Sequence, residues 1–259
     1  MLQKIAKFIS NLFINCILLI ILIVLFAAIV TGISYANMSK RINEGKEYYK
    51  TNYTSAKNCF VDSVLLKNHA NSSNETPIHI NTYSSLVKDC LERYPENVRA
   101  CITDNWSIVF TPTTPAFATQ YLDGCSSDLN SAVTVPDIQT IFVYTKDIEV
   151  IPYVLTHEFG HALAYEYGCL EYTKDFEELY YLFKHTYKET SPYAVPSYAV
   201  RSSSEFFAST LSAYVTEPEW LWLEAPGVAD YMEEMLKTKP YKNEFGKIIT
   251  RVRGMIRVD

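Results

Sequence analysis

The chain has 259 residues, enough for one medium-sized domain or two small ones with a buried core. Acidic residues outnumber basic ones and give a formal net charge of -6. No run of Lys and Arg marks a basic surface, so the composition excludes the nucleic-acid-binding class.

A long apolar segment lies near the N-terminus. From Leu12 to Val30 the only polar residue is Asn15, and a span of about 20 apolar residues matches the thickness of a bilayer core. We therefore expect residues 1–36 to be a separate segment that crosses the membrane within residues 12–34. A cleaved signal peptide ending at Ala36 is the alternative. The apolar region of a signal peptide usually runs about 7–15 residues, so the longer segment here favours an uncleaved anchor.

Two further features favour an exterior location for the rest of the chain. Cysteines after the anchor are more frequent than a reduced cytosolic enzyme of this size needs, and their odd number allows at most two disulfides. They are Cys59, Cys90, Cys101, Cys125 and Cys169. N-x-[ST] triplets, which can carry glycans in a eukaryotic secretory protein, begin at Asn37, Asn52, Asn71, Asn74 and Asn105. The basic residues flanking the anchor are nearly balanced and do not set its orientation.

The region after the anchor is polar at first and then becomes regular. Residues 37–81 are rich in Asn, Ser and Lys, which indicates a stalk or loosely structured lead-in, with a helix around residues 55–68. From about residue 82 apolar residues recur at helical spacing, and this pattern stops before Pro95. We expect the folded domain to span residues 82–259.

Two short strands are expected next. The run WSIVFT at residues 106–111 alternates as a strand does, and TIFVY at 140–144 is rich in β-branched and aromatic residues. Residues 112–137 hold prolines, glycine, Ser and Asp, and are expected to be mainly loop. We expect the strand at 140–145 to lie at the edge of the sheet, where an extended peptide can add itself as a further strand.

Helices dominate the remainder of the chain. One is expected to begin near Pro152, which suits a first helical turn, and to end at Gly168, which suits a C-cap. Further helices are expected over residues 173–189, from about Ser203, and over residues 226–237. Strands first and helices afterwards indicate an α+β domain.

The helix that ends at Gly168 contains the motif HEFGH. Residues four apart lie on one helix face, so His157 and His161 can direct their imidazoles at one point. Neutral imidazole is a good zinc ligand, and Glu158 is placed to act as a general base towards an attacking water. Gly160 permits close approach of another element. The alternative is a helix whose two histidines are only solvated or packed in the core.

A third zinc ligand must come from elsewhere in the chain. A metzincin would have glycine and histidine where this chain has Ala164 and Tyr167, so that class is excluded. The downstream candidates are His185, Glu171, Glu177, Glu178, Glu189 and Glu205. Glu205 is favoured because it lies in a first helical turn that residues 206–208 would bury against the HEFGH helix. The alternative is a capping box with Ser202, in which the carboxylate caps its own helix.

Two tyrosines on the loop before this helix are candidate oxyanion donors. A phenol of either Tyr193 or Tyr198 would donate a hydrogen bond to the tetrahedral intermediate, and residue chemistry alone leaves both open. A hydroxyl from Ser209 or Thr210, or a backbone carbonyl, is expected to orient the histidine rings.

The motifs carry a resemblance to a known family. HEFGHAL at residues 157–163, followed downstream by Y-x6-E with E-F-F-A, resembles the catalytic domain of anthrax lethal factor and its relatives, which include the clostridial Pro-Pro endopeptidases. The run YPENVRACITDNWSIVFTP at residues 94–112 is similar to the lead-in helix and strand of such domains. The resemblance implies a zincin-like metallopeptidase fold, with a small twisted sheet, an active-site helix and a helical C-terminal lobe.

The same resemblance implies a role for each matching residue. It implies one zinc ion held by His157, His161 and Glu205, with Glu158 as the general base. It implies Tyr198, seven residues before Glu205, as the transition-state donor in place of Tyr193.

We therefore expect a zinc-dependent endopeptidase that acts on extracellular peptide or protein substrates. It would be anchored in the membrane with its catalytic domain outside the cytoplasm, or secreted if cleaved after Ala36. The alternative is a catalytically silent zincin-fold module that binds or scaffolds at the membrane. Cleavage of host kinases and proline-directed specificity are not implied, because the chain lacks the receptor-binding and docking parts of lethal factor.

Overall fold

The structure is a computed structural model, and its described residues are 13–30, single positions between 32 and 47, 53–56, 59–62, 80–115, 118, 121, 131–145, 147–168, 170–188, 192, 194 and 197–238. Tyr193, Glu189, Cys125, Cys169 and the asparagine of every N-x-[ST] triplet except Asn105 lie outside these residues. The chain separates into two compact units, Met1–Tyr48 and Tyr49–Asp259.

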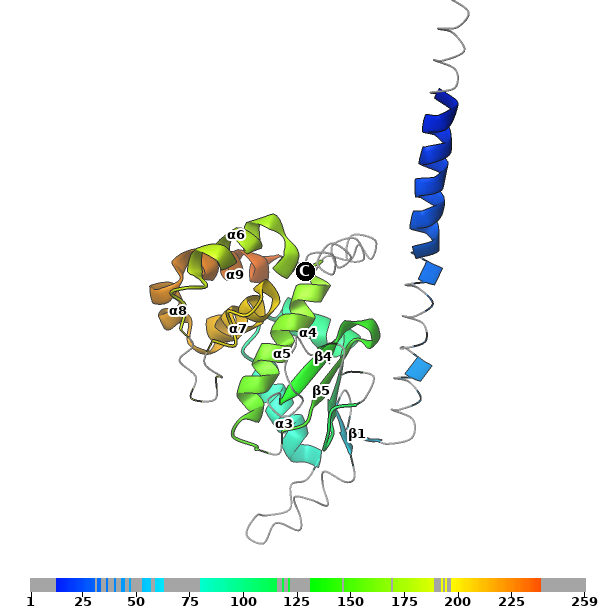
Figure 1. Ribbon diagram of the computed structural model, residues 1–259. Helices are drawn as coiled ribbons and strands as arrows, with labels where there is room; N and C mark the ends of the chain where they lie inside the picture. The colour runs from blue at the N-terminus through cyan, green and yellow to red at the C-terminus, as the bar shows by residue number, and fades with distance from the viewer. Residues whose placement is uncertain are drawn as a thin grey trace, which may run out of the picture. The chain divides into compact units, whose positions relative to one another are not determined.

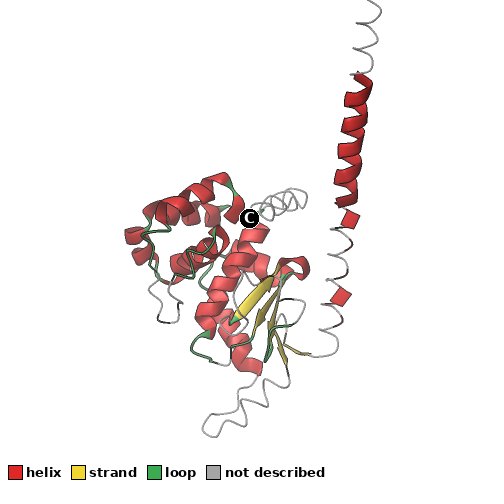
Figure 2. Cartoon of the chain, viewed as in Figure 1, coloured by secondary structure: helices red, strands yellow, loops and turns green. Residues whose placement is uncertain are grey.

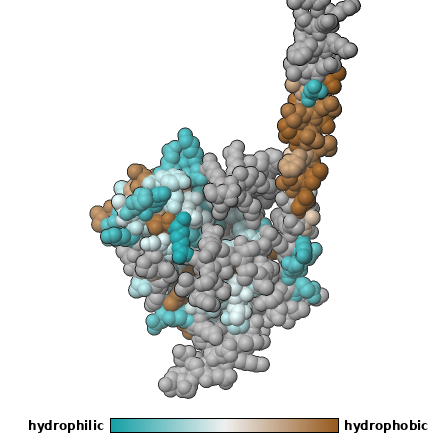
Figure 3. All heavy atoms as spheres, viewed as in Figure 1, coloured by the Kyte–Doolittle hydropathy of each residue, from teal (hydrophilic) through white to brown (hydrophobic). Residues whose placement is uncertain are grey.

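The first unit contains one long apolar helix. Phe13–Val30 is long and apolar enough to cross a membrane, although a signal sequence near an N-terminus has the same length and composition. Its large side chains are exposed, and the space-filling view colours it hydrophobic along most of its length (Figure 3). The apolar segment expected from the sequence is therefore helical, and it has the length and composition of a membrane anchor or a signal sequence.

The second unit is built on a five-stranded sheet (Figures 1 and 2). Its spatial order is β1 (Tyr53–Ala56), β2 (Cys59–Asp62), β3 (Ser107–Phe110), β5 (Thr140–Val143) and β4 (Ala132–Val135). Neighbouring strands β2, β3 and β5 run parallel, whereas β1 and β4 run antiparallel to their partners at the two ends. The strands SIVF and TIFV are almost fully buried, as expected for the parallel centre of a sheet.

The sheet differs from the expectations in several places. The strand at 140–145 is not an edge, because β4 pairs along its outer side from Ala132↔Val143 to Val135↔Thr140. Residues 112–137, expected to be mainly loop, also contain β4, whose four side chains are all buried and so give no alternating pattern. A helix around 55–68 is not found in the described part of that range, where β1 and β2 lie. These two strands belong to the sheet although they fall within the expected stalk at 37–81.

Helices account for most of the remaining described residues. In chain order they are α3 (Ile80–Leu91), α4 (Glu96–Asn105), α5 (Ile151–Glu166), α6 (Lys174–Phe183), α7 (Ser203–Thr216), α8 (Pro218–Glu224) and α9 (Pro226–Lys237), with short 3-10 turns η2 (Pro136–Ile138) and η3 (Leu170–Tyr172). The helix expected to end near 189 ends earlier, at Phe183, and α8 was not expected. The expected stop at Gly168 is confirmed, because its φ of 92° is left-handed.

Helix α5 lies at the centre of the fold, in contact with the sheet and α3 on one side and with α7 on another (Figure 1). Its C-terminal end is fixed by the buried carboxylate of Glu166. Trp106 Nε1 and Gln139 Nε2 donate hydrogen bonds of 3.1 and 3.0 Å to the same oxygen of Glu166. These bonds tie the end of α5 to the start of β3 and to the turn between β4 and β5.

Helices α5 and α7 approach each other closely at one point. A Cβ on Gly160 would lie 2.6 Å from Ala208 Cα and 2.9 Å from its carbonyl oxygen, so only glycine fits. One turn earlier on α5, Thr156 Oγ1 lies 2.7 Å from Ser212 Oγ across the same interface. The expected close approach at Gly160 is confirmed, and it brings the first turns of α7 against the HEFGH motif.

The aromatic residues after Glu205 face a different helix from the one expected. The ring of Phe207 lies 4.9 Å from that of Phe176 on α6, and Phe206 packs against Tyr180 and Tyr187 at 5.6 and 5.1 Å. Ala208 supplies the contact with α5 instead. The first turn of α7 is therefore held from both sides, by α5 and by the aromatic side chains of α6 and the turn after it.

The cysteines described here do not support the expected disulfides. Cys59 and Cys90 are free thiols, 3% and 1% exposed. Burial raises the pKa of Cys59 to about 12 and that of Cys90 to about 11. Both are therefore core residues, and they do not count as evidence for an oxidising compartment.

Candidate active site

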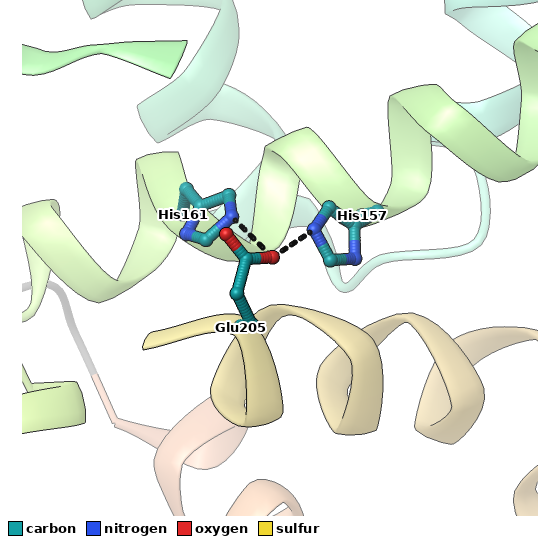
Figure 4. Close-up of side chains that lie close together, drawn as sticks. All are labelled: His157, His161 and Glu205. Carbon is teal, nitrogen blue, oxygen red and sulfur yellow. Dashed lines mark hydrogen bonds and ion pairs between the residues drawn. The ribbon is translucent and has the colours of Figure 1, made fainter. Parts of the chain in front are cut away.

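Two histidines of α5 and one glutamate of α7 meet at one point (Figure 4). Glu205 Oε2 lies 3.0 Å from His157 Nε2 and 3.6 Å from His161 Nε2. One ligand atom from each of the three residues lies within 4.8 Å of the others. His157 and His161 lie on one face of α5, as their spacing predicts. Both Nε2 atoms are on the side of α7, where they contact Glu205.

The first turn of α7 forms only half of a capping box. Ser202 Oγ accepts a hydrogen bond of 3.1 Å from the Glu205 amide, so the serine caps the helix. The Glu205 carboxylate does not return to the helix N-terminus and instead contacts the two histidines. Between the two roles that the sequence left open for this carboxylate, the structure has the interhelical one.

Two hydroxyls of α7 lie behind the histidine rings. Ser209 Oγ is 3.2 Å from His157 Nδ1, and Ser204 Oγ is 3.3 Å from His161 Nδ1. A hydrogen bond at Nδ1 fixes the orientation of the ring and leaves the lone pair of Nε2 available for a metal. The expectation that a hydroxyl orients a histidine ring is thus met at Ser209, and Ser204 does the same for the second ring.

The cluster is strongly coupled electrostatically. Burial acts to lower the pKa of His161, but the charge and hydrogen bond of Glu205, with smaller contributions from Glu158 and Glu171, raise it to about 9. Burial acts to raise the pKa of Glu205, but the charge of His161 and the hydrogen bonds of both histidines hold it well below its usual range. Glu205 and a positive charge therefore stabilise each other at this point, and a bound cation would supply that charge in place of the imidazolium.

Glu158 is buried beside the cluster and bonded to the sheet. It is 7% exposed, and its Oε2 accepts a hydrogen bond of 2.6 Å from Thr134 Oγ1 on β4. Its charge also contributes to the raised pKa of His161, so the carboxylate lies within electrostatic reach of that ring. The residue expected to be the general base is thus close to the histidines and held in place by an edge strand.

Tyr198 lies close to His157. The two rings have centroids 6.0 Å apart, and Arg201 Cζ stacks 5.1 Å from the tyrosine ring. Ser197 immediately before it has a φ of 64°, a left-handed conformation unusual for a residue with a side chain. Tyr198 therefore lies next to the histidine cluster, and a sharp turn of the backbone precedes it.

The other candidate ligands do not join the cluster in the described part of the chain. His185 is exposed in the turn after α6, and Glu178 pairs with Lys174 at 3.6 Å on the α6 surface. Glu177 is half-buried on the same helix. Glu171 is buried and close enough to act on His161 but is not one of the three converging residues.

The converging side chains suit a zinc ion. Two imidazole nitrogens and one carboxylate oxygen are the donor set of many catalytic zinc sites, which keep a further position open for water. Zinc binds nitrogen and oxygen at about 2.0–2.2 Å, so three donors spaced within 4.8 Å need only small movements to hold one ion. The buried carboxylate also supplies charge compensation that two neutral imidazoles lack.

No family model and no curated protein matches the chain. Among solved structures, a Pro-Pro endopeptidase (PPEP-2) from Paenibacillus alvei is similar over 69% of this chain and 97% of its own, with 14% sequence identity and a TM-score of 0.43. This similarity is too low to say to which family the chain belongs.

Sequence reasoning missed two residues that contact the candidate site. Ser204 precedes Glu205 directly, and a hydroxyl in the first turn of a ligand-bearing helix was a usable signal for it. Thr134 lies 24 residues before Glu158 in a segment expected to be loop, so only the pairing of β4 with β5 reveals its position. No local pattern in the sequence joins that threonine to the HEFGH motif.

Proposed function

We propose that this protein is a zinc-dependent endopeptidase. The observation that carries the proposal is the convergence of His157, His161 and Glu205, with their ligand atoms within 4.8 Å of one another. A buried set of two imidazoles and a carboxylate, beside a further glutamate, has little structural purpose without a metal. The proposed ligands are these three residues, and the proposed cofactor is one zinc ion.

Each neighbouring side chain then has a defined task. When bound, zinc lowers the pKa of a coordinated water towards 7 and polarises the scissile carbonyl. Glu158 accepts the proton of the attacking water and passes it to the leaving amine. Tyr198 donates a hydrogen bond from its phenol to the carbonyl oxygen as negative charge develops there. Ser204 and Ser209 keep the two imidazole rings aligned.

The sheet edge offers a place for the substrate. Because β4 and not β5 is the edge strand next to α5, an extended peptide would add itself along Ala132–Val135. Main-chain hydrogen bonds to an edge strand bind peptides with little dependence on sequence, so this geometry suits a peptide or unfolded protein segment.

Metal analysis and a peptide library test the proposal directly. Full-length protein in detergent should contain about one zinc per chain, and it should cleave peptides of a random library in a chelator-sensitive manner. Glu158→Gln should abolish cleavage while zinc stays bound, since Glu158 is not a ligand. Zinc binding without cleavage of any peptide would favour a catalytically silent module, and full turnover of Glu158→Gln would exclude the mechanism.

We propose further that residues 1–36 anchor or direct the chain to the membrane, and that the catalytic domain, which includes β1 and β2, lies outside the cytoplasm. Helix Phe13–Val30 supports the first part. Carbonate extraction of membranes, with N-terminal sequencing of the mature protein, separates the two forms. Extraction-resistant protein with an intact N-terminus indicates an anchor, whereas a new N-terminus after Ala36 indicates a signal peptide.

A further inference from the structure

A hydroxyl of the edge strand contacts the general base. Thr134 is 8% exposed on β4, and its Oγ1 lies 2.6 Å from Glu158 Oε2 and 3.2 Å from the main-chain carbonyl of the same residue. Glu158 itself is 7% exposed. The Thr134 hydroxyl therefore contacts both the carboxylate and the main-chain carbonyl of Glu158, the residue that follows the first histidine of HEFGH.

The carboxylate is the principal partner of this hydroxyl. A hydroxyl has one proton to donate, and a hydrogen bond of 2.6 Å to an ionised oxygen is in the charge-assisted range. The longer contact of 3.2 Å goes to the carbonyl of Glu158, which lies inside α5 and already has an i+4 amide as its helical partner. The short bond thus occupies Oε2, and Oε1 is the oxygen that would accept the proton of the attacking water in the proposed mechanism.

A buried carboxylate without such a bond is less firmly placed for catalysis. Its side chain can rotate among several rotamers, because three χ angles separate the carboxylate from the backbone. A base must also lie within about 2.6–3.2 Å of the proton that it accepts, so rotation out of place lowers the rate. The hydrogen bond from Thr134 to Oε2 restricts this rotation of the Glu158 side chain.

We propose that Thr134 is a positioning residue for Glu158, fixing the carboxylate so that one oxygen faces the attacking water. The inference rests on the proposed function. It also joins substrate binding to catalysis, because the strand that would pair with the peptide carries the hydroxyl that orients the base.

The chain offers a matched control for this residue. Thr140 is fully buried on the neighbouring strand β5, where it pairs in register with Val135, and its Oγ1 bonds to the carbonyl of Ile138 at 2.9 Å. Thr140→Val removes the same atom from the same sheet without touching Glu158. Thr134→Ser keeps the hydroxyl and serves as the rescue variant.

The kinetic test compares these variants in the full-length zinc-loaded protein on a peptide that the wild type cleaves. Thr134→Val should lower kcat by about 10- to 100-fold, as loss of supporting hydrogen bonds in metal sites does. Its KM and zinc content should stay unchanged, Thr134→Ser should recover most of the rate, and Thr140→Val should keep it. Equal kcat values for Thr134→Val and Thr140→Val would overturn the inference.

If Thr134→Val lowers the Tm much more than Thr140→Val does, the comparison moves to Thr134→Ala and Thr134→Ser. Both variants lack the methyl group and only the serine keeps the hydroxyl, so a rate difference between them reports the hydrogen bond alone. Equal rates for these two variants would likewise overturn the inference.

A second readout does not depend on activity. In metal-free protein, Thr134→Val should lower the Tm less in a Glu158→Ala background than in the wild type, because the bond is already lost there. Thr140→Val should cause the same shift in both backgrounds. Equal shifts for Thr134→Val would show that the two residues do not interact. Wild-type protein without peptidase activity would refute the proposed function, while this cycle would still test the contact.

Discussion

Ala208 of α7 lies so close to Gly160 of α5 that a Cβ added to the glycine would stand 2.6 Å from the alanine Cα. The atoms in the way belong to the backbone and cannot move aside as the end of a flexible side chain can. Glu205 lies one turn before Ala208 on the same helix. This contact therefore sets the distance between the helix that bears the two histidines and the helix that bears the glutamate.

Gly160→Ala should separate the two helices and weaken metal binding. Forcing an extra methyl group into a packed core typically costs about 1–3 kcal/mol, and here part of the strain would displace Glu205. We expect a lower Tm in metal-free protein and a loss of zinc affinity, measured by competition with a chromophoric chelator. Gly227→Ala is the control, since its Cβ would meet the end of the Leu179 side chain at 3.3 Å. Equal zinc affinities in the two variants would contradict the expectation.

Ser209→Ala should reduce zinc affinity without unfolding the protein. The serine hydroxyl lies 3.2 Å from His157 Nδ1, and loss of such a partner typically costs about 10- to 100-fold in metal affinity or activity. Ser212→Ala is a matched control on the same helix, because that hydroxyl bonds to Thr156 at 2.7 Å and not to a histidine. We expect Ser212→Ala to lower stability but not zinc affinity. The reverse pattern would exclude ring orientation by Ser209.

Zinc binding should release a proton near neutral pH. Because Glu205 raises the pKa of His161 to about 9, this ring is charged at pH 7 in the metal-free protein and must lose its proton to bind zinc. Affinity should therefore fall by up to about tenfold for each pH unit below 9. Calorimetry in buffers of different ionisation enthalpy measures the released proton. His185→Gln should leave the result unchanged, and binding without proton release would contradict it.

The same shift has a consequence for metal-free stability. His161 has a folded-state pKa of about 9, above its ordinary value of 6.5, so its pairing with Glu205 stabilises the fold fully below about pH 6.5. This contribution is lost as the pH rises from 6.5 to 9. Thermal unfolding of chelator-treated protein across this range should show a falling Tm, and His161→Gln should remove that slope.

Tyr198→Phe should slow the chemical step. Its ring lies 6.0 Å from that of His157, and removing one donor to a developing oxyanion costs about 10²- to 10³-fold in kcat. Zinc content should not change, because the phenol is not a proposed ligand. Tyr181→Phe, with a side chain 62% exposed on α6, is the control and should keep full activity. Equal kcat values for the two variants would remove Tyr198 from the mechanism.

Local patterns predicted most of the helices and the two strands β3 and β5, but not the other three strands of the sheet. The turn of Gly168 and the apolar spacing of α5 are encoded within one segment, so the motif helix was predictable almost to the residue. Strand β4 was not, because its four residues are all buried and lie just before Pro136. Strands β1 and β2 lie in a region that is polar overall. They join the rest of the sheet through the pairing of β2 with β3, which lies far along the chain.

The candidate site likewise has residues that local patterns predicted and residues that depend on tertiary contacts. His157, Glu158 and His161 follow from helical periodicity. Glu205 was favoured over five other candidates by its place in a first turn, but the sequence could not decide between a cap and an interhelical contact. That decision depends on the spacing of α5 and α7. The role of Thr134 depends on sheet register, which no short-range pattern carries.

The division of the proposed ligands between two helices has a consequence for the unfolded chain. Glu205 lies 44 positions after His161 in the sequence, and the segment between them includes η3, α6 and Tyr198. An ion bound to both closes this segment into a loop. A permanent cross-link of the same length would remove about 4 kcal/mol of chain entropy from the unfolded state. Without zinc, the segment between His161 and Glu205 is no longer closed into a loop by the ion. In a zinc-poor environment, α6 and the loop of Tyr198 would therefore be the first segments open to proteolysis.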